Sequence, residues 1–305
     1  MTGVKNKIKY TAAVVLTLFF TAYLLIFGGA AREAAKGGLD VCFDVILTAV
    51  FPFSVASKLL ISSGVCGFLG KTAAKPLARL LGLSPSGAGV FLLGLVGGYP
   101  TGASGAAELY RSGLISKSEA EVVISYSNNA TPAFMINYIG LLIGSKRLGL
   151  IFYTVNICAA LIWALFLRKK TGPEYKTVSK PLDFSFISAV KSCGGQILNV
   201  CFFIIVFAVI SSVFSLLPPP FSSVFRGFTE LTTGAAVLSG ADLPARITAS
   251  LICAASSFSG LCVASQVISV SRGAGIGVKY YVCGKIFQSV ISFFAVFILY
   301  PYILS

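Results

Sequence analysis

The sequence contains no histidine, and its eight cysteines are scattered along the chain. The cysteines lie singly in or near apolar segments, with no Cys-x-x-Cys pair, at positions 42, 66, 158, 193, 201, 253, 262 and 283. Zinc sites and disulfide frameworks need such residues in recognisable groups. We therefore expect no metal site and no disulfide scaffold.

Catalytic motifs are also lacking. The chain has no Gly-x-Ser-x-Gly motif, no phosphate-binding glycine loop and no close group of carboxylates. Without histidine, the commonest general base in enzymes is missing as well. These absences argue against an enzyme, and we expect no cofactor. An intramembrane enzyme is the alternative to this interpretation.

Charged residues are few and mostly positive. Only 11% of the residues are charged, 24 are Lys or Arg against 10 Asp or Glu, and 56% are hydrophobic. This composition is too apolar for a soluble domain of 305 residues. The positive charges lie in short loops between apolar runs, a pattern that indicates membrane topology. We expect a lipid bilayer around the protein and no nucleic acid partner.

Apolar runs long enough to cross a bilayer as helices recur along the chain. We predict full spans at 10–29, 40–62, 119–144, 148–167, 188–216, 246–270 and 280–302. Two shorter apolar segments, 86–103 and 227–243, are interpreted as re-entrant hairpins, since the first breaks at glycines and a proline after about half a bilayer. The first run exceeds the apolar core of a signal peptide, so we expect it to be retained, with cleavage as the alternative.

Loop charges predict the orientation. With a cytoplasmic N-terminus and two re-entrant segments, most lysines and arginines, Lys58 and Lys285 among them, fall on the inside. Outside remain Arg32, Lys36, Lys146, Arg147, Arg226 and Arg246. If segment 86–103 crossed the membrane instead, the basic run 168–170 would face outward. The re-entrant interpretation avoids that conflict.

The same assignment predicts an internal repeat. After an N-terminal transmembrane helix (1–39), a first repeat (40–170) and a second (188–305) flank a cytoplasmic linker (171–187). Each repeat contains a re-entrant helical hairpin and an interrupted transmembrane helix, broken at 127–132 and at 256–260. The predicted fold class is therefore an all-α polytopic membrane protein with two inverted-topology repeats, the common plan of secondary transporters.

The two helix breaks and the two hairpin tips are the candidate solute site. A helix broken within the membrane leaves backbone N–H and C=O groups without partners, except where protein or a water-filled cavity satisfies them. Polar side chains at a break can bind solute, or they can only cap the helices and join their neighbours. The candidates are Gly98, Tyr99, Pro100, Thr101, Asn128, Asn129, Thr131, Glu230, Thr232, Thr233, Ser256, Ser257, Ser259 and Gln266.

Two charged residues add alternatives. Glu230 within the membrane would suggest coupling to protons or cations, whereas at the membrane boundary it would pair with Arg226. Lys58, a weaker candidate, is expected to extend toward the interface.

Residues 95–140 carry a resemblance to a known family. The motifs are Gly98-Tyr99-Pro100-Thr101-Gly102-Ala103, Glu108-Leu109-Tyr110, Gly113-Leu114-Ile115-Ser116 and Ser127-Asn128-Asn129. They resemble the family of YlbJ-type sporulation integral membrane proteins, also called stage V sporulation protein V, whose nucleoside-recognition or Gate domain also occurs in concentrative nucleoside transporters. The resemblance implies the hairpin and broken-helix plan that the topology predicts.

The resemblance also implies a function. Such a protein would lie in the outer forespore membrane of a sporulating bacterium and pass dipicolinic acid, a small aromatic dianion, toward the spore. Paired Asn donors, helix N-termini and the Tyr99 ring would suit that solute. The alternatives are a nucleoside or nucleobase permease and a non-transporting scaffold of a spore-envelope complex. A homo-oligomer and spore-membrane partners are left open.

Overall fold

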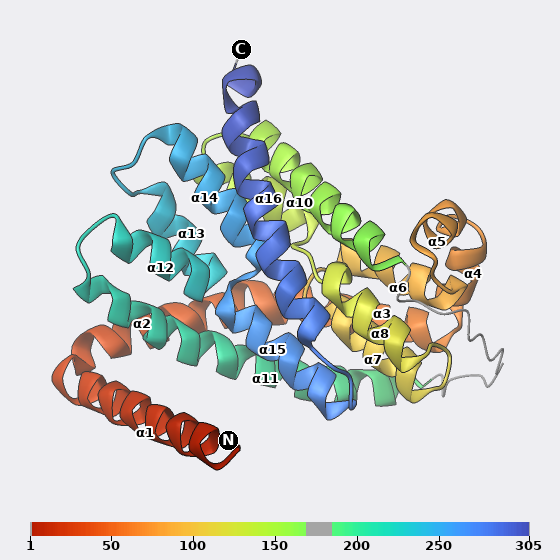
Figure 1. Cartoon of the computed structure of the whole chain (residues 1–305), viewed down its shortest axis with the longest axis horizontal. Helices are drawn as coiled ribbons and strands as arrows, with labels where there is room; N and C mark the ends of the chain where they lie inside the picture. The colour runs from red at the N-terminus through yellow and green to blue at the C-terminus, as the bar shows by residue number, and fades with distance from the viewer. Residues whose placement is uncertain (1, 169–184, 305) are drawn as a thin grey trace.

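The computed structural model describes residues 2–168 and 185–304, and every element in those residues is helical (Figure 1). All but the last three residues of the predicted linker 171–187 lie outside them. The helices of the N-terminal half are α1 (Thr2–Ile26), α2 (Gly28–Val41), the π-helix η1 (Cys42–Val50), α3 (Phe51–Ser62), α4 (Val65–Lys71), α5 (Lys75–Leu81), α6 (Pro85–Gly97), α7 (Thr101–Arg111), α8 (Lys117–Ser127), the π-helix η2 (Phe134–Ile139), α9 (Gly140–Leu142) and α10 (Lys146–Leu167).

The described part of the C-terminal half is also entirely helical. Its helices are α11 (Phe186–Val213), the 3₁₀ turn η4 (Phe214–Leu216), α12 (Phe221–Thr229), α13 (Leu231–Ser239), α14 (Ala245–Phe258), α15 (Gly260–Gly273) and α16 (Lys279–Leu304). In Figure 1, α10, α14 and α16 pack side by side, and α11 lies along α2.

Several of these helices are long and apolar enough to cross a membrane. Within the described residues there are four, counting α14 and α15 as one span, and up to seven if each of three sharply bent helix pairs is one span. The four are Lys146–Leu167, Phe186–Leu216, Ala245–Gly273 and Lys279–Tyr302. The chain is a multi-pass, all-α membrane protein.

The order of elements repeats. In the first copy, α3 is followed, after the two short helices α4 and α5, by the hairpin α6–α7, the broken helix α8–η2 and the span α10. In the second, α11 is followed by the hairpin α12–α13, the broken helix α14–α15 and the span α16. Each copy crosses an odd number of times, because the hairpins re-enter, so the second copy is inverted relative to the first. The predicted fold class is confirmed.

The N-terminal helices differ from the prediction. We expected a span at 10–29, a loop, and a second span at 40–62. Instead, α1 ends at Ile26, the chain bends by 99°, and helix is continuous from Gly28 to Ser62 through η1. The reason lies at Gly38, where an added Cβ would come within 3.1 Å of the Ile205 Cα on α11. Gly38 therefore serves close helix packing and not a loop.

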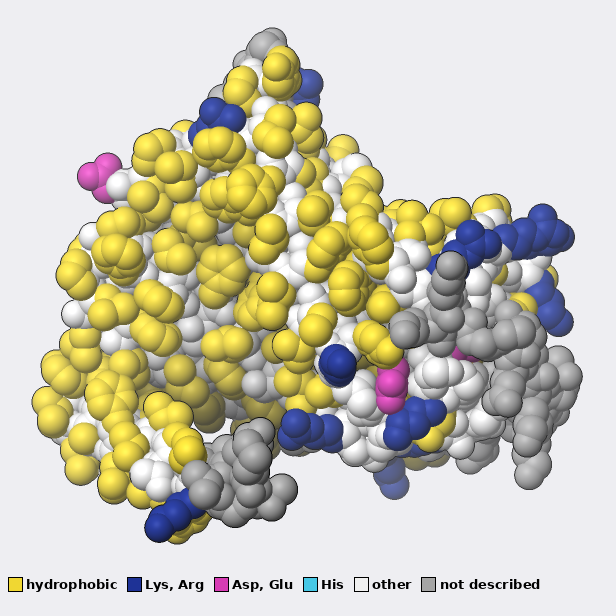
Figure 2. Space-filling model, viewed as in Figure 1, with side chains coloured by type: hydrophobic (Ala, Val, Ile, Leu, Met, Phe, Trp, Pro, Cys, Tyr) yellow, Lys and Arg dark blue, Asp and Glu magenta, His cyan; other side chains and the backbone are white. Residues whose placement is uncertain are grey.

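The surface is mostly hydrophobic, with basic side chains at its ends. Figure 2 shows hydrophobic side chains covering the face over α1, α14 and α16. Lys and Arg gather mainly near the end that α4 to α8 form, and smaller groups lie where α16 finishes and beside α1. This uneven distribution is typical of a membrane protein with one basic side.

Candidate functional site

The first hairpin packs directly on the first helix break. The chain turns at Gly98, whose φ of +69° favours glycine, between the end of α6 and the start of α7. An added Cβ at Gly94 or Gly102 would clash with the carbonyl oxygen of Ser127. Glycine at both positions therefore lets the hairpin touch the C-terminal end of α8.

Asn128 and Asn129 form that break, and their side-chain amides are bonded to backbone. The Asn128 Oδ1 accepts from the Ala103 N–H at 2.9 Å, and its Nδ2 donates to the Ile124 oxygen at 2.9 Å. The Asn129 Nδ2 donates to the Tyr126 oxygen at 2.7 Å. Both residues are buried. In this conformation they match the capping alternative, and their contact with solute stays a prediction.

The second hairpin turns at Glu230, which caps its own second helix. The Glu230 backbone is extended, and its carboxylate accepts from the Thr232 N–H at 3.0 Å and from the Thr233 N–H and hydroxyl at 2.7 Å each. Among the described ion pairs none joins Glu230 to Arg226, so the predicted pairing does not form. A carboxylate at a helix N-terminus is stabilised by free N–H groups and by the helix dipole, which leaves it no need of the arginine.

The second break lies at Ser259 and Gly260, which have φ of +75° and +74°. An added Cβ at Gly260 would lie 3.2 Å from the Leu231 nitrogen, so this break packs on the second hairpin tip. Ser256 and Ser257 belong to the last turn of α14 and are buried. The break is thus shorter than the predicted range 256–260, because α14 continues to Phe258. The Ser256 hydroxyl donates to the Ile252 oxygen of the same helix at 2.8 Å.

A cavity of about 650 Å³ lies where the two hairpin tips meet the first helix break, and α15, which follows the second break, forms part of its wall. Most of its wall is apolar, and the lining residues come from α2, η1, α3, α6, η2, α11, α13 and α15 as well as from the first tip and the first break. Its polar lining residues are Tyr99, Thr131, Asn137, Tyr138, Glu230, Thr232 and Gln266. The predicted residues Pro100 and Thr101 line a second, smaller cavity. The lining of neither cavity includes Gly98, Asn128, Asn129, Thr233, Ser256, Ser257 or Ser259.

Sequence reasoning missed two polar residues of the larger cavity. Asn137 is exposed and lines the wall from η2, the second part of the broken helix. Tyr138, beside it, donates from its hydroxyl to the Thr232 oxygen at 2.6 Å and so joins the two repeats. Two polar residues in a row, Asn137 and Tyr138, inside the otherwise apolar predicted span 119–144 could have indicated this part of the wall.

Lys285 is the clearest correction to the predicted topology. We expected it among the charges on the inner side, but it is 2% exposed within α16. Its ammonium donates to the Asn128 carbonyl oxygen, to the Ser257 oxygen at 3.2 Å and to the Gln288 Oε1 at 3.5 Å. The carbonyls that the two helix breaks leave without helical partners explain why a lysine is tolerated here.

Lys285 belongs to a polar face of α16 whose side chains form hydrogen bonds with residues at both helix breaks. The Gln288 Nε2 donates to the Ser125 oxygen at 2.9 Å, and the Ser289 hydroxyl donates to the Ala254 oxygen at 3.0 Å. The Ser292 hydroxyl pairs with that of Ser257 at 2.6 Å. Polar residues at spacings of three, four and seven within an apolar run mark one helix face, a signal that was present in the sequence.

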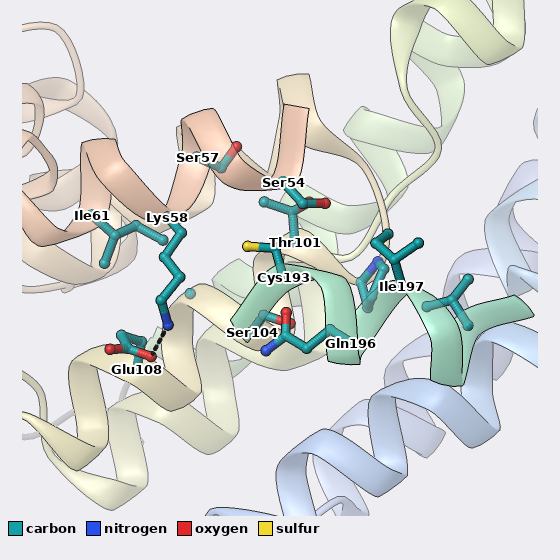
Figure 3. Close-up of a pocket in the computed structure, with 13 residues that line it drawn as sticks. Ser54, Ser57, Lys58, Ile61, Thr101, Ser104, Glu108, Cys193, Gln196 and Ile197 are labelled. Atoms are coloured by element: carbon teal, nitrogen blue, oxygen red, sulfur yellow. Dashed lines mark hydrogen bonds and ion pairs between the residues drawn. The ribbon is translucent and has the colours of Figure 1, made fainter. Parts of the chain in front are cut away.

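Lys58 also departs from its expected position. Instead of extending toward the interface, its ammonium lies 3.3 Å from the Glu108 Oε2, beside the smaller cavity (Figure 3). Glu108 follows the first hairpin tip by two turns of α7, so the nearby carboxylate determines where the lysine points.

Comparison with known proteins supports the resemblance found in the sequence. The chain is 26% identical to the sporulation integral membrane protein YlbJ of Bacillus subtilis (strain 168), over 96% of this chain and 83% of YlbJ. The resemblance to YlbJ is confirmed. No family model matches the chain.

A solved structure is similar as well. It is CNTnw, a double variant in an outward-facing state, with 15% sequence identity and a TM-score of 0.48, covering 95% of this chain and 86% of CNTnw. At this level of similarity we draw nothing from it about the site. The similarity to YlbJ and the apolar helices identify an integral, multi-pass membrane protein.

Proposed function

We propose that the protein carries a small organic anion across a membrane through the larger cavity, and that this anion is dipicolinate. The observation that supports it best is the cavity itself, which lies where both hairpin tips meet the first helix break and the helix α15 that follows the second break. Transporters bind solute at such junctions between inverted repeats. A volume of about 650 Å³ lies within the range of pockets for small organic ligands.

The chemistry of the wall suits a planar acid. Phe53, Phe134 and Tyr138 line the cavity with aromatic rings, the last two stacked at 5.1 Å between centroids. The Tyr99 hydroxyl is buried without a hydrogen-bond partner among the described residues. Tyr99, Gln266 and Asn137 can donate to carboxylates, while the rings pack on an aromatic face.

The setting proposed for this carrier follows from its relatives and its charges. We place its N-terminus in the cytoplasm, because the larger basic end would then lie on the inner side. The resemblance to YlbJ supports a role in spore formation, and we place the protein in the outer forespore membrane. Transport without a chemical reaction is proposed, so no residue is given a catalytic role.

One observation favours a second candidate, a nucleoside permease. The cavity lining includes the Glu230 carboxylate but no lysine or arginine. A neutral solute with hydroxyl groups would meet that carboxylate without charge repulsion. The anion proposal instead requires that the three donors from α13 offset enough of the Glu230 charge for an anion to bind beside it.

The test is uptake by purified protein in liposomes, with labelled dipicolinate and labelled uridine compared. We expect dipicolinate uptake, and Tyr99→Phe should weaken dipicolinate binding about tenfold or more, the effect of losing one hydrogen bond to a charged group. Tyr281→Phe is the matched control, since its buried hydroxyl also lacks a partner but does not line the cavity. Uridine uptake without dipicolinate uptake would favour the permease.

A further inference from the structure

A second, smaller cavity lies on the other side of the first hairpin tip. It measures about 40 Å³ and lies between single faces of α3, α7 and α11 (Figure 3). Its polar side chains follow helical spacing on α3 and on α7: Ser54, Ser57, Lys58, Thr101, Ser104 and Glu108. We call it the polar passage, since its lining extends along α7 from the hairpin tip to the ion pair.

The hairpin tip separates the polar passage from the larger cavity. Gly97 and Tyr99 line the larger cavity, and the next residues, Pro100 and Thr101, line the passage. Val200 on α11 lines both. A shift of the tip would therefore join the two spaces into one path.

The passage contains hydroxyl groups that lack partners. The Ser57 side chain is 2% exposed, and neither its oxygen nor the buried Ser104 oxygen has a hydrogen-bond partner among the described residues. Buried polar atoms are satisfied in nearly all proteins, and those left unsatisfied cost stability. Two such hydroxyls facing one narrow space are explained if a polar solute or water passes there.

Charge is the third observation. Lys58 is the only cation among the residues that line either cavity, and its partner Glu108 lies at 3.3 Å with both side chains partly exposed. An ion pair that is partly solvated is weak, so its members can exchange partners at little cost. A carboxylate of the solute is chemically equivalent to that of Glu108.

From these observations we infer that the polar passage is a second binding site for the anion, in which Lys58 exchanges Glu108 for a carboxylate of the solute. This inference rests on the proposed function, since it needs an anionic solute. Lys58 would also supply the positive charge that the lining of the larger cavity lacks. At about 40 Å³ the passage has room for ordered water but not for an aromatic diacid, so here the ion pair keeps it closed.

The alternative is that the Lys58–Glu108 pair only fastens α3 to α7. A charge exchange separates the two readings, because Lys58→Glu with Glu108→Lys keeps a pair but places the acid on α3. If the pair only fastens the helices, the exchanged protein transports normally. If Lys58 binds the solute, the exchanged protein folds but transports poorly, because its lysine then lies on α7 and its glutamate on α3.

The experiment measures labelled dipicolinate uptake in liposomes, dipicolinate binding by calorimetry, and melting temperature for each variant. We expect Lys58→Gln to lower the uptake rate at least tenfold, the loss of one charged hydrogen bond, with binding at the larger cavity changed less than about twofold. Lys58→Arg should keep most of the uptake. Lys191→Gln, an exposed cation on α11 that does not line the passage, is the control.

The outcomes are distinct. Wild-type uptake that Lys58→Gln leaves unchanged, or full uptake by the charge-exchanged protein, overturns the second site while the proposed carrier stands. A wild-type protein that takes up no dipicolinate overturns the carrier proposal and the second site together. Reduced uptake with an unchanged melting temperature in both Lys58→Gln and the exchanged protein supports the inference.

Discussion

The two hairpins share a shape but stabilise their tips in different ways. The first tip has no acid, and its second helix, α7, is capped from outside by the Asn128 amide. The second tip caps itself, since the Glu230 carboxylate binds the first turn of α13. The first half therefore depends on a contact between a hairpin and a distant break, whereas the second contains its cap within the hairpin. Copies that share topology need not share polar chemistry.

The largest effect is expected from Lys285, which bonds to the breaks of both halves. Lys285→Met should leave the Asn128 and Ser257 carbonyl oxygens without this partner. Each unsatisfied buried group costs about 1–3 kcal/mol, so we expect a large fall in melting temperature in detergent. Lys191→Met, an exposed position, is the control. An unchanged melting temperature for Lys285→Met would contradict the proposed link between the halves.

An intermediate effect is expected from the first hairpin. Gly102→Ala places a methyl group against the Ser127 carbonyl, and overpacking of this kind costs about 1–3 kcal/mol. Gly37→Ala is the matched control, since nothing lies within 4 Å of its added Cβ. Thermal unfolding followed by circular dichroism measures both. Equal stability of the two variants would mean that the tip and the break are not in contact.

The smallest effect on stability is expected in the second hairpin. Glu230→Gln keeps one of the two acceptor oxygens that bind α13 and replaces the other with an NH2 group. It therefore loses the charge at the helix N-terminus, worth about 0.3–1 kcal/mol, and one hydrogen bond, worth about 1 kcal/mol. Its effect on binding should be larger and should depend on the solute. Removing a carboxylate from the cavity wall should tighten dipicolinate binding and weaken that of a nucleoside, as calorimetry can measure. Weaker dipicolinate binding would contradict the anion proposal.

The hairpins and breaks were predictable because their signals are local. Glycines and Pro100 end α6 whatever surrounds them, and the segment 128–132 cannot continue a helix into proline without interruption. The combination of two broken helices with two short apolar segments then predicts the repeat. For the same reason the position of the larger cavity could be predicted, including the placement of Tyr99, Thr131, Glu230, Thr232 and Gln266 in its wall.

The remaining features depend on contacts between helices that sequence spacing does not reveal. Lys285 was placed on the inner side by the positive-inside rule, which considers only charges in loops. The rule cannot foresee that two backbone carbonyl groups accept hydrogen bonds from a lysine inside the membrane. Asn128 has the chemistry of a solute ligand, but an N–H group 25 positions earlier takes its oxygen. The π-helix η1 packs against α11, and no residue pattern marked its π-helical form.

The π-helix η1 continues directly into α3, so one helix lines both cavities. Its wall residues Val45, Ile46 and Val50 face the larger cavity, and the α-helical turns that follow carry Lys58 into the polar passage. A π-helix takes more residues per turn than an α-helix, so any change of η1 to α-helical form would rotate α3 about its own axis. That rotation would swing Lys58 away from Glu108. The form of η1 therefore sets the angle at which α3 presents Lys58 to Glu108.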